Sequence, residues 1–390
     1  MAKTIGGHIF SKQIVSLSSI ALMIVCFAHL FANKKKTEIN LNIVVLLMYL
    51  AFNIFVCNPD PIYMAWPRLL LFIVVLSIAS PLFASRNAIH FRRYCITWGL
   101  LFCIAISVVS FFCYFLGINL MTNEGEYLED YERIGGHFSG VTNQSMMLGP
   151  IAGISVLSLL CNFFRFKSNK KKWALLIMCA GALLFSASRS SVVATLGGMI
   201  CVLLILRNRD KRFVRKTVTA IIVLLLLFPL WDSALDGIKQ KNISRADSGR
   251  FESRTGKFEG RLREFYGSPI IGIGYGVIRI ARLSSTEQVS IEPGSSWLGI
   301  LSMTGIIGFI IFFILFFKCW DIVRKKEFDI QRRAFLLGLL TFFAINMIFE
   351  GYIYAGGSPL CFMIWLVLGV SHDCKFSQKP MIPQIIKEKR

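Results

Sequence analysis

Arginine is the residue type whose placement in this chain points most clearly to chemistry. Arg189 stands in the polar turn Ser186-Ala-Ser-Arg-Ser-Ser191 between two apolar runs. Farther along, the segment 231–296 holds seven arginines against three lysines. A guanidinium presents a planar fork of donors that matches a phosphate or a carboxylate. These arginines therefore predict an anionic partner. Anchoring of Arg189 at a headgroup boundary and plain solvation of a mixed-charge loop remain the alternatives.

Candidate general bases occur in the same part of the chain. Glu292 precedes an apolar run and is the first choice, with Glu252 and Glu264 as further carboxylates and His137 as another base. The Gly272-Ile-Gly-Tyr-Gly276 element lacks dinucleotide-binding spacing and predicts a tight turn. Neither a metal-ligand cluster nor a nucleotide-binding loop is found, so we expect no metal and no cofactor.

The composition fixes the class of protein that must position these groups. Of 390 residues, 55% are hydrophobic and only 17% are charged, and the mean hydropathy is +0.62. Soluble domains keep about a quarter of their residues charged. The apolar residues come in runs that match the hydrocarbon thickness of a bilayer. We therefore expect an all-α, polytopic integral membrane protein with about 11 (10–12) transmembrane helices.

The predicted spans follow from these runs. They cover about 13–32, 39–57, 66–84, 95–118, 145–164, 173–187, 190–206, 217–231, 297–317, 334–349 and 358–371. The first run is long enough to span and is read as the first helix rather than as a cleaved signal. The whole chain, 1–390, is predicted to be one polytopic membrane domain.

Lysine and arginine cluster in alternate connections between the predicted spans, which predicts that these connections are cytoplasmic. The net charge of +21 is then a consequence of topology, and no nucleic-acid partner is expected. The basic tail 372–390 is predicted to be cytoplasmic. Residues 119–143 form a first exterior loop, and residues 231–296 form one large periplasmic loop that we expect to be catalytic.

The order of the polar elements resembles the O-antigen ligase and polymerase family (Wzy-type) of bacterial envelopes. The resemblance rests on Gly-His-Phe-Ser-Gly-Val-Thr-Asn143, the Ser-Arg-Ser turn, Ser248-Gly-Arg250, Pro269-Ile-Ile-Gly-Ile-Gly274 and Gly305-Ile-Ile-Gly308. These motifs extend over about residues 130–310. One departure is the segment Ser290–Ser296, which lacks the histidine that the ligase branch usually carries there. This departure favours the polymerase branch.

The resemblance implies a glycosyltransferase that polymerises polyprenyl-pyrophosphate-linked oligosaccharide repeat units into O-antigen, capsular or exopolysaccharide. It further implies a multi-pass protein of the bacterial inner membrane with a periplasmic active face. The implied partners are the lipid-linked glycan donor and acceptor, membrane lipid and a chain-length regulator protein. The alternatives are ligase-type transfer to a lipid or protein acceptor, and a polysaccharide transporter or flippase without enzymatic activity.

The site residues expected from the resemblance and the chemistry fall into two groups. The catalytic ones are Arg189 and Arg250, which we expect to converge on one pyrophosphate, and Glu292 as the base. Glu350, Tyr352 and Tyr354 could line the same cavity. The residues expected to bind substrate are Asn143, His137, Arg254, Arg261, Arg263 and Tyr275.

Overall fold

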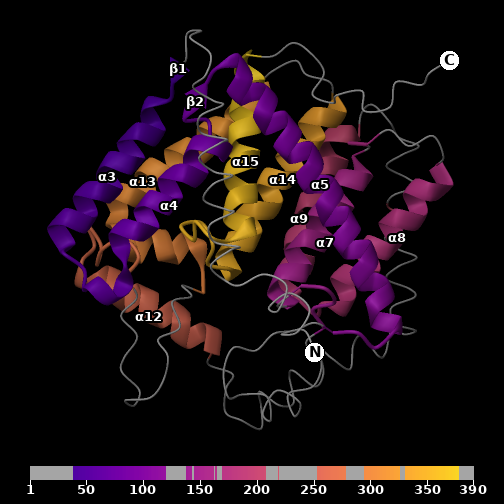
Figure 1. Ribbon diagram of the computed structural model, residues 1–390, viewed down its shortest axis with the longest axis horizontal. Coiled ribbons are helices and arrows are strands. Elements are labelled where there is room, and N and C mark those ends of the chain that lie inside the picture. The colour runs from indigo at the N-terminus through magenta and orange to yellow at the C-terminus, as the bar shows by residue number, and fades with distance from the viewer. Residues whose placement is uncertain are drawn as a thin grey trace, which may run out of the picture.

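A computed structural model describes residues 38–119, 138–142, 145–161, 163–164, 169–207, 218, 253–277, 294–325 and 330–376. This part of the chain is mostly helical, as predicted (Figure 1). The helices are α3 (Leu41–Cys57), α4 (Ala65–Ala79), α5 (Arg86–Phe115), α7 (Ser145–Leu160), α8 (Asn169–Phe185), α9 (Arg189–Leu206), α12 (Ser253–Gly267), α13 (Ser296–Lys325), α14 (Ile330–Phe349) and α15 (Pro359–Asp373). Short 3-10 helices cover η1 (Pro61–Tyr63) and η4 (Cys374–Phe376), and β1 (Glu38–Ile39) pairs antiparallel with β2 (Phe83–Ala84).

Among the described residues, five helices are long and apolar enough to cross a membrane: α5, α9, α13, α14 and the segment Pro359–Phe376. Helices α3, α4 and α7 are apolar but shorter. The chain is thus a multi-pass membrane protein. The predicted all-α class is confirmed apart from the two-residue β1–β2 pair, whereas the count of eleven spans stays a prediction.

The hydropathy runs locate every described α-helix except the polar helix α12, and they leave out the polar ends of several helices, most of all those of α5 and α13. The predicted spans 13–32 and 217–231 lie outside the described residues, apart from residue 218. Helix α5 begins at Arg86 rather than near residue 95, and α13 continues to Lys325 rather than ending near residue 317. These extensions carry charged residues, which a hydropathy average excludes although the helical backbone continues through them.

Apart from α12, which lies across one end, the described helices run alternately up and down, so that polar connections gather at the two ends of the bundle (Figure 1). One end joins the start of α5 to the end of α15. There, buried Arg92 makes a bidentate ion pair with Asp373, at 2.7 and 2.6 Å, and donates to two backbone carbonyls. The loss of one partner of such a buried pair leaves an uncompensated charge. The pair therefore locks the two helices in register.

Small residues let α9 approach α7 and α14 closely. Gly198 of α9 faces the carbonyl of Gly338 in α14, where an added Cβ would lie 2.8 Å from that oxygen. Gly149 of α7 faces Ser188 and Ser191, where an added Cβ would meet their side chains at 2.6 Å. Close backbone approach is how helices pack where lipid supplies no hydrophobic drive between them. This packing holds the start of α9 against the end of α14.

Candidate active site at the arginine turn

The turn that joins α8 to α9 presents one exposed cation among buried serines. Ala187 adopts a left-handed backbone conformation, with φ of 49°, and thereby reverses the chain before α9. Ser188, Ser190 and Ser191 are buried, whereas Arg189 is exposed as the first residue of α9. The hydroxyls of Ser188 and Ser191 lie 2.8 Å apart. The turn is thus fixed by serine contacts while its guanidinium extends from the buried surface.

A buried carboxylate lies beside this turn. The Ser190 hydroxyl donates a hydrogen bond of 2.9 Å to Oε1 of Glu350, which directly follows α14 and is only 5% exposed. A charged group at such a depth is a functional hypothesis by default, because burial away from water is costly. The sequence suggested Glu350 as a residue that lines the site. The structure places it in contact with Ser190, which directly follows Arg189.

The start of α13 completes this polar cluster. The Ser296 backbone N–H and hydroxyl both donate to the Glu350 carbonyl, at 3.0 and 2.6 Å. The same hydroxyl accepts from the backbone N–H of Tyr352 at 3.0 Å. The ends of α9, α13 and α14 are therefore tied together around Glu350.

Two further polar side chains are buried at this end of α14. Asn346 and the Tyr352 hydroxyl make no side-chain hydrogen bond with any described residue. Burial raises the pKa of Tyr352 well above its ordinary value, and the Glu350 carboxylate raises it further. Tyr352 is therefore a neutral phenol at physiological pH and keeps a proton that it can donate.

A break in α13 lies close to this cluster. Gly305 has φ of 62° and ψ of −168°, so that the helical hydrogen-bond ladder is interrupted there. The loop after α12 replaces the missing bonds. The amides of Ile306 and Ile273 pair with the carbonyls of Pro269 and Ser302, at 2.9 and 3.0 Å, and the Gly274 amide pairs with the Met303 carbonyl at 3.1 Å. Irregular backbone at membrane depth is tolerated where protein satisfies it in this way.

Helix α3 holds the inserted loop from the other side. Asn53 is fully buried and donates to the Ile271 carbonyl at 2.7 Å while it accepts from the Tyr275 amide at 2.6 Å. Tyr49 donates to the Thr304 carbonyl, at 2.6 Å, beside the break. The sequence analysis predicted a role for neither residue. Asn53 could have been identified, because a polar asparagine within an apolar span is a signal of a buried polar contact.

The predicted binding residues in this region occupy different environments. Tyr275 is 1% exposed and packs between Phe72 and Tyr354. Arg261 of α12 is 6% exposed and pairs with Glu264 at 2.7 Å. Burial lowers the pKa of Arg261 below its ordinary value, and the Glu264 carboxylate opposes this shift. Arg263 is largely exposed and lies 3.6 Å from Glu259, and Arg254 lies in the first turn of α12.

Four predicted site residues lie outside the described residues: Arg250, Glu292, Asn143 and His137. The ends of the predicted exterior loop 119–143 are described, and there Asn119 accepts hydrogen bonds from the Ser139 backbone N–H and hydroxyl at 3.0 and 2.7 Å. Within the described ranges, no group of three or more histidine, cysteine, aspartate or glutamate side chains could hold a metal ion.

A family model described as O-antigen ligase matches residues 173–313. The matched segment contains most of α8, the arginine turn, α9, α12, the inserted loop and the break in α13. No curated protein matches the chain. The resemblance predicted from the sequence is thus confirmed, since residues 173–313 are similar to the O-antigen ligase family.

Proposed function

We propose that the protein polymerises polyprenyl-pyrophosphate-linked oligosaccharide repeat units on the periplasmic face of the bacterial inner membrane. The observation that carries the proposal is the arginine turn, in which exposed Arg189 adjoins Ser190 and its hydrogen bond to buried Glu350. The turn lies within the segment that matches the O-antigen ligase family. That match supports glycan transfer of the ligase or polymerase type as the broader activity.

The chemistry requires stabilisation of a departing diphosphate. In the proposed step, an acceptor hydroxyl attacks the anomeric carbon of the donor, and the bond between this carbon and the pyrophosphate oxygen breaks. Negative charge develops on the diphosphate, and bidentate guanidinium donors bind such charge strongly without a metal. We assign this role to Arg189 together with Arg250.

The attacking hydroxyl must lose its proton to a base. Glu292 remains the carboxylate proposed from the sequence, and Glu350 is the carboxylate that contacts the arginine turn, through its hydrogen bond from the Ser190 hydroxyl. Both carboxylates are therefore candidates for this step.

The choice of polymerase over ligase rests on the segment Ser290–Ser296, which lacks the histidine of the ligase branch. A strain that lacks the gene distinguishes these activities by its surface glycan. Loss of a polymerase leaves single repeat units on the carrier or anchor, whereas loss of a ligase leaves glycan that is not attached to its acceptor. Loss of a flippase instead leaves the units on the cytoplasmic face, and that result would contradict the proposal.

Arg189→Lys tests the role of the guanidinium, because lysine keeps the charge but lacks the two-donor fork. We expect the rate of polymerisation of purified lipid-linked repeat units, without added metal, to fall about a hundredfold, which corresponds to on the order of 3 kcal/mol in the transition state. Arg250→Lys should behave in the same way.

The matched control is Arg324→Lys, since Arg324 is an exposed arginine at the opposite end of the bundle that pairs with Asp321. It should polymerise at the native rate, with expression of all variants checked by immunoblot. Native rates in both Arg189→Lys and Arg250→Lys would show that these arginines only anchor the protein at the interface.

A further inference from the structure

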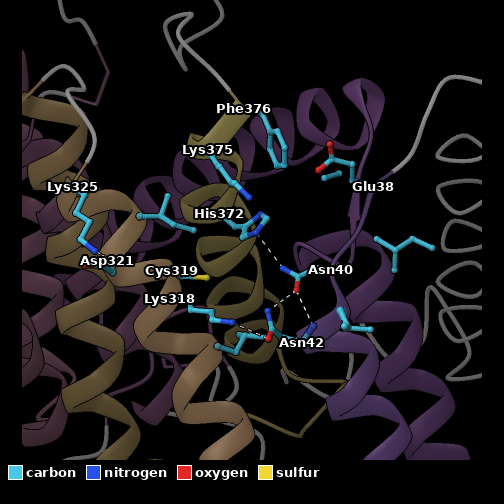
Figure 2. A pocket seen from close by; sticks show the side chains of 15 residues that line it. Glu38, Asn40, Asn42, Lys318, Cys319, Asp321, Lys325, His372, Lys375 and Phe376 are labelled. Atoms are coloured by element: carbon cyan, nitrogen blue, oxygen red, sulfur yellow. Dashed lines mark hydrogen bonds and ion pairs between the residues drawn. The ribbon is translucent and has the colours of Figure 1, made fainter.

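A cavity of ≈ 590 Å³ opens at the basic end of the bundle, far from the arginine turn (Figure 2). It lies where the start of α3 meets the ends of α13 and α15. Its polar wall includes Asn40, Asn42, Lys318, His372 and Lys375. The charge pattern of the sequence predicts that this end faces the cytoplasm. The proposed transfer reaction uses none of these residues.

The hydrogen bonds at the cavity fix the protonation of its histidine. Asn40 Oδ1 accepts from the Asn42 backbone N–H at 3.1 Å, as the cap of α3. The Asn40 Nδ2 group must then be the donor to Nε2 of His372, 3.2 Å away. His372 is therefore neutral with its proton on Nδ1. This Nδ1 makes no hydrogen bond with any described residue. Because this Nδ1 is buried from solvent, His372 shapes the wall of the cavity but does not present a donor to it.

Lys318 and Lys375 bring positive charge to the wall of the cavity, which also holds the carboxylates of Glu38 and Asp321. Lys318 Nζ donates to Oδ1 of Asn42 at 3.1 Å, and this neutral amide leaves the lysine charge intact. Asp321 accepts from Lys325 at 2.7 Å and from Arg324 at 3.1 Å within α13. Figure 2 shows Lys318 and Lys375 on the two sides of His372, with Glu38 beyond them near Phe376. The cluster is suited to an anion that accepts several hydrogen bonds.

The remaining wall of the cavity is apolar. Leu315 and Ile322 of α13, Leu41 of α3 and Phe376 of η4 all line it. Leu41 and Phe376 are also exposed on the surface of the bundle. A small hydrophilic anion would leave these side chains without a partner, whereas an amphiphile would cover them with its chain and place its charge at the lysines.

We propose that this cavity binds an anionic phospholipid, with the headgroup phosphate held by Lys318 and Lys375. An acyl chain then runs along Leu315 and Ile322. Basic pockets between membrane helices bind anionic headgroups on the cytoplasmic side, where such lipids are enriched. The bound lipid would bridge α3, α13 and α15 and stabilise their basic ends. This site is independent of the proposed glycan transfer.

The test measures the binding of phosphatidylglycerol and phosphatidylcholine to the full-length protein in detergent by native mass spectrometry. The variant is Lys318→Gln/Lys375→Gln, and the matched control is Lys170→Gln/Lys171→Gln, two exposed lysines of α8 at the same end but outside the cavity. Each lysine near a headgroup contributes about fivefold in affinity, so the cavity variant should bind phosphatidylglycerol about twenty-fivefold more weakly. The control should bind as the native protein does.

Three results would overturn the proposal. The first is equal binding of the two lipids by the native protein. The second is equal weakening in the cavity variant and the control. The third is displacement of phosphatidylglycerol by millimolar inorganic phosphate, which would assign the site to free phosphate instead.

A second measurement uses the native chain and does not depend on the folding of a variant. Photoactivatable phosphatidylglycerol should crosslink to peptides that contain Leu315–Lys325 or His372–Phe376. Crosslinks confined to other helices would contradict the assignment.

Discussion

At the scale of single residues, Glu350 is the group that the structure adds to the candidate site. Its side chain accepts from Ser190, while its backbone carbonyl accepts from Ser296. The side chain and the backbone of one residue therefore have separable roles. A change that removes only the carboxylate charge should leave the backbone connection between α13 and α14 intact.

Glu350→Gln is expected to lower the rate of glycan polymerisation at least tenfold without loss of folded protein. The amide keeps the size of the side chain but is a far weaker base and carries no charge. The measurement is the transfer rate with purified lipid-linked repeat units, with the amount of folded protein taken from size-exclusion chromatography. A native rate would remove Glu350 from the site and leave Glu292 as the proposed base.

Ser190→Ala tests whether the hydrogen bond to Glu350 positions the carboxylate. A hydrogen bond to a charged group is worth about 1.5–3 kcal/mol, so its loss should reduce the transfer rate about tenfold or more. Ser77→Ala is the control, because the Ser77 hydroxyl donates to the Ile73 carbonyl of its own helix α4 and to no other described residue. Equal rates in the two variants would show that the Ser190 contact is structural.

At the scale of elements, the break in α13 and the loop that fills it depend on each other. Gly305 ends one helical segment, and Pro269–Gly274 supply the donors and acceptors that the break exposes. Gly272 is one of the points where the two backbones meet closely. It has φ of 84°, and an added Cβ would lie 2.5 Å from the Met303 carbonyl oxygen. Neither conformation nor space allows a side chain there.

Gly272→Ala is accordingly expected to destabilise the protein by about 2–4 kcal/mol, from the left-handed backbone and the clash together. The measurement is the apparent Tm in detergent by fluorescence-detected size exclusion. Gly260→Ala is the matched control, because Gly260 lies within α12 with no atom within 4 Å of an added Cβ. It should keep or slightly raise the Tm. A native Tm for Gly272→Ala would mean that the loop does not insert into the break.

At the scale of the whole molecule, the two polar ends differ in kind. One end carries the arginine turn, the inserted loop and α12, and the other carries the Arg92–Asp373 pair and the lysine-lined cavity. Alternating helix directions place these groups at opposite ends (Figure 1). The distribution of basic residues predicts which end is cytoplasmic.

The topology is tested with Tyr266→Cys on α12, where the side chain is 73% exposed, and Lys170→Cys at the opposite end. A membrane-impermeant maleimide should label Tyr266→Cys in spheroplasts and Lys170→Cys only after the inner membrane is permeabilised. The native protein, whose described cysteines are buried or partly buried, gives the background. The reverse labelling pattern would place the candidate active site on the cytoplasmic side and would end the proposed mechanism.

The sequence by itself determined the class of the molecule and the positions of its described apolar helices, but not helix α12, which lies within the predicted loop 231–296. A helix that crosses lipid must satisfy its backbone internally and be apolar over about 20 residues, so each span leaves a local signal in the chain. This is why the apolar runs that correspond to α9, α14 and α15 could be found from the sequence alone. Arg189 was found for the same reason, since a lone arginine between apolar runs is conspicuous.

Only the tertiary structure decided which polar groups meet. Ser190 and Glu350, or Asn53 and Tyr275, are far apart in the chain, and their contacts arise from the packing of α9 on α14 and of α3 against the inserted loop. The break at Gly305 was likewise hidden, because glycine in an apolar run reads as an ordinary helix residue until another backbone segment takes up its hydrogen bonds. Such contacts depend on helix order and rotation, which hydropathy does not encode.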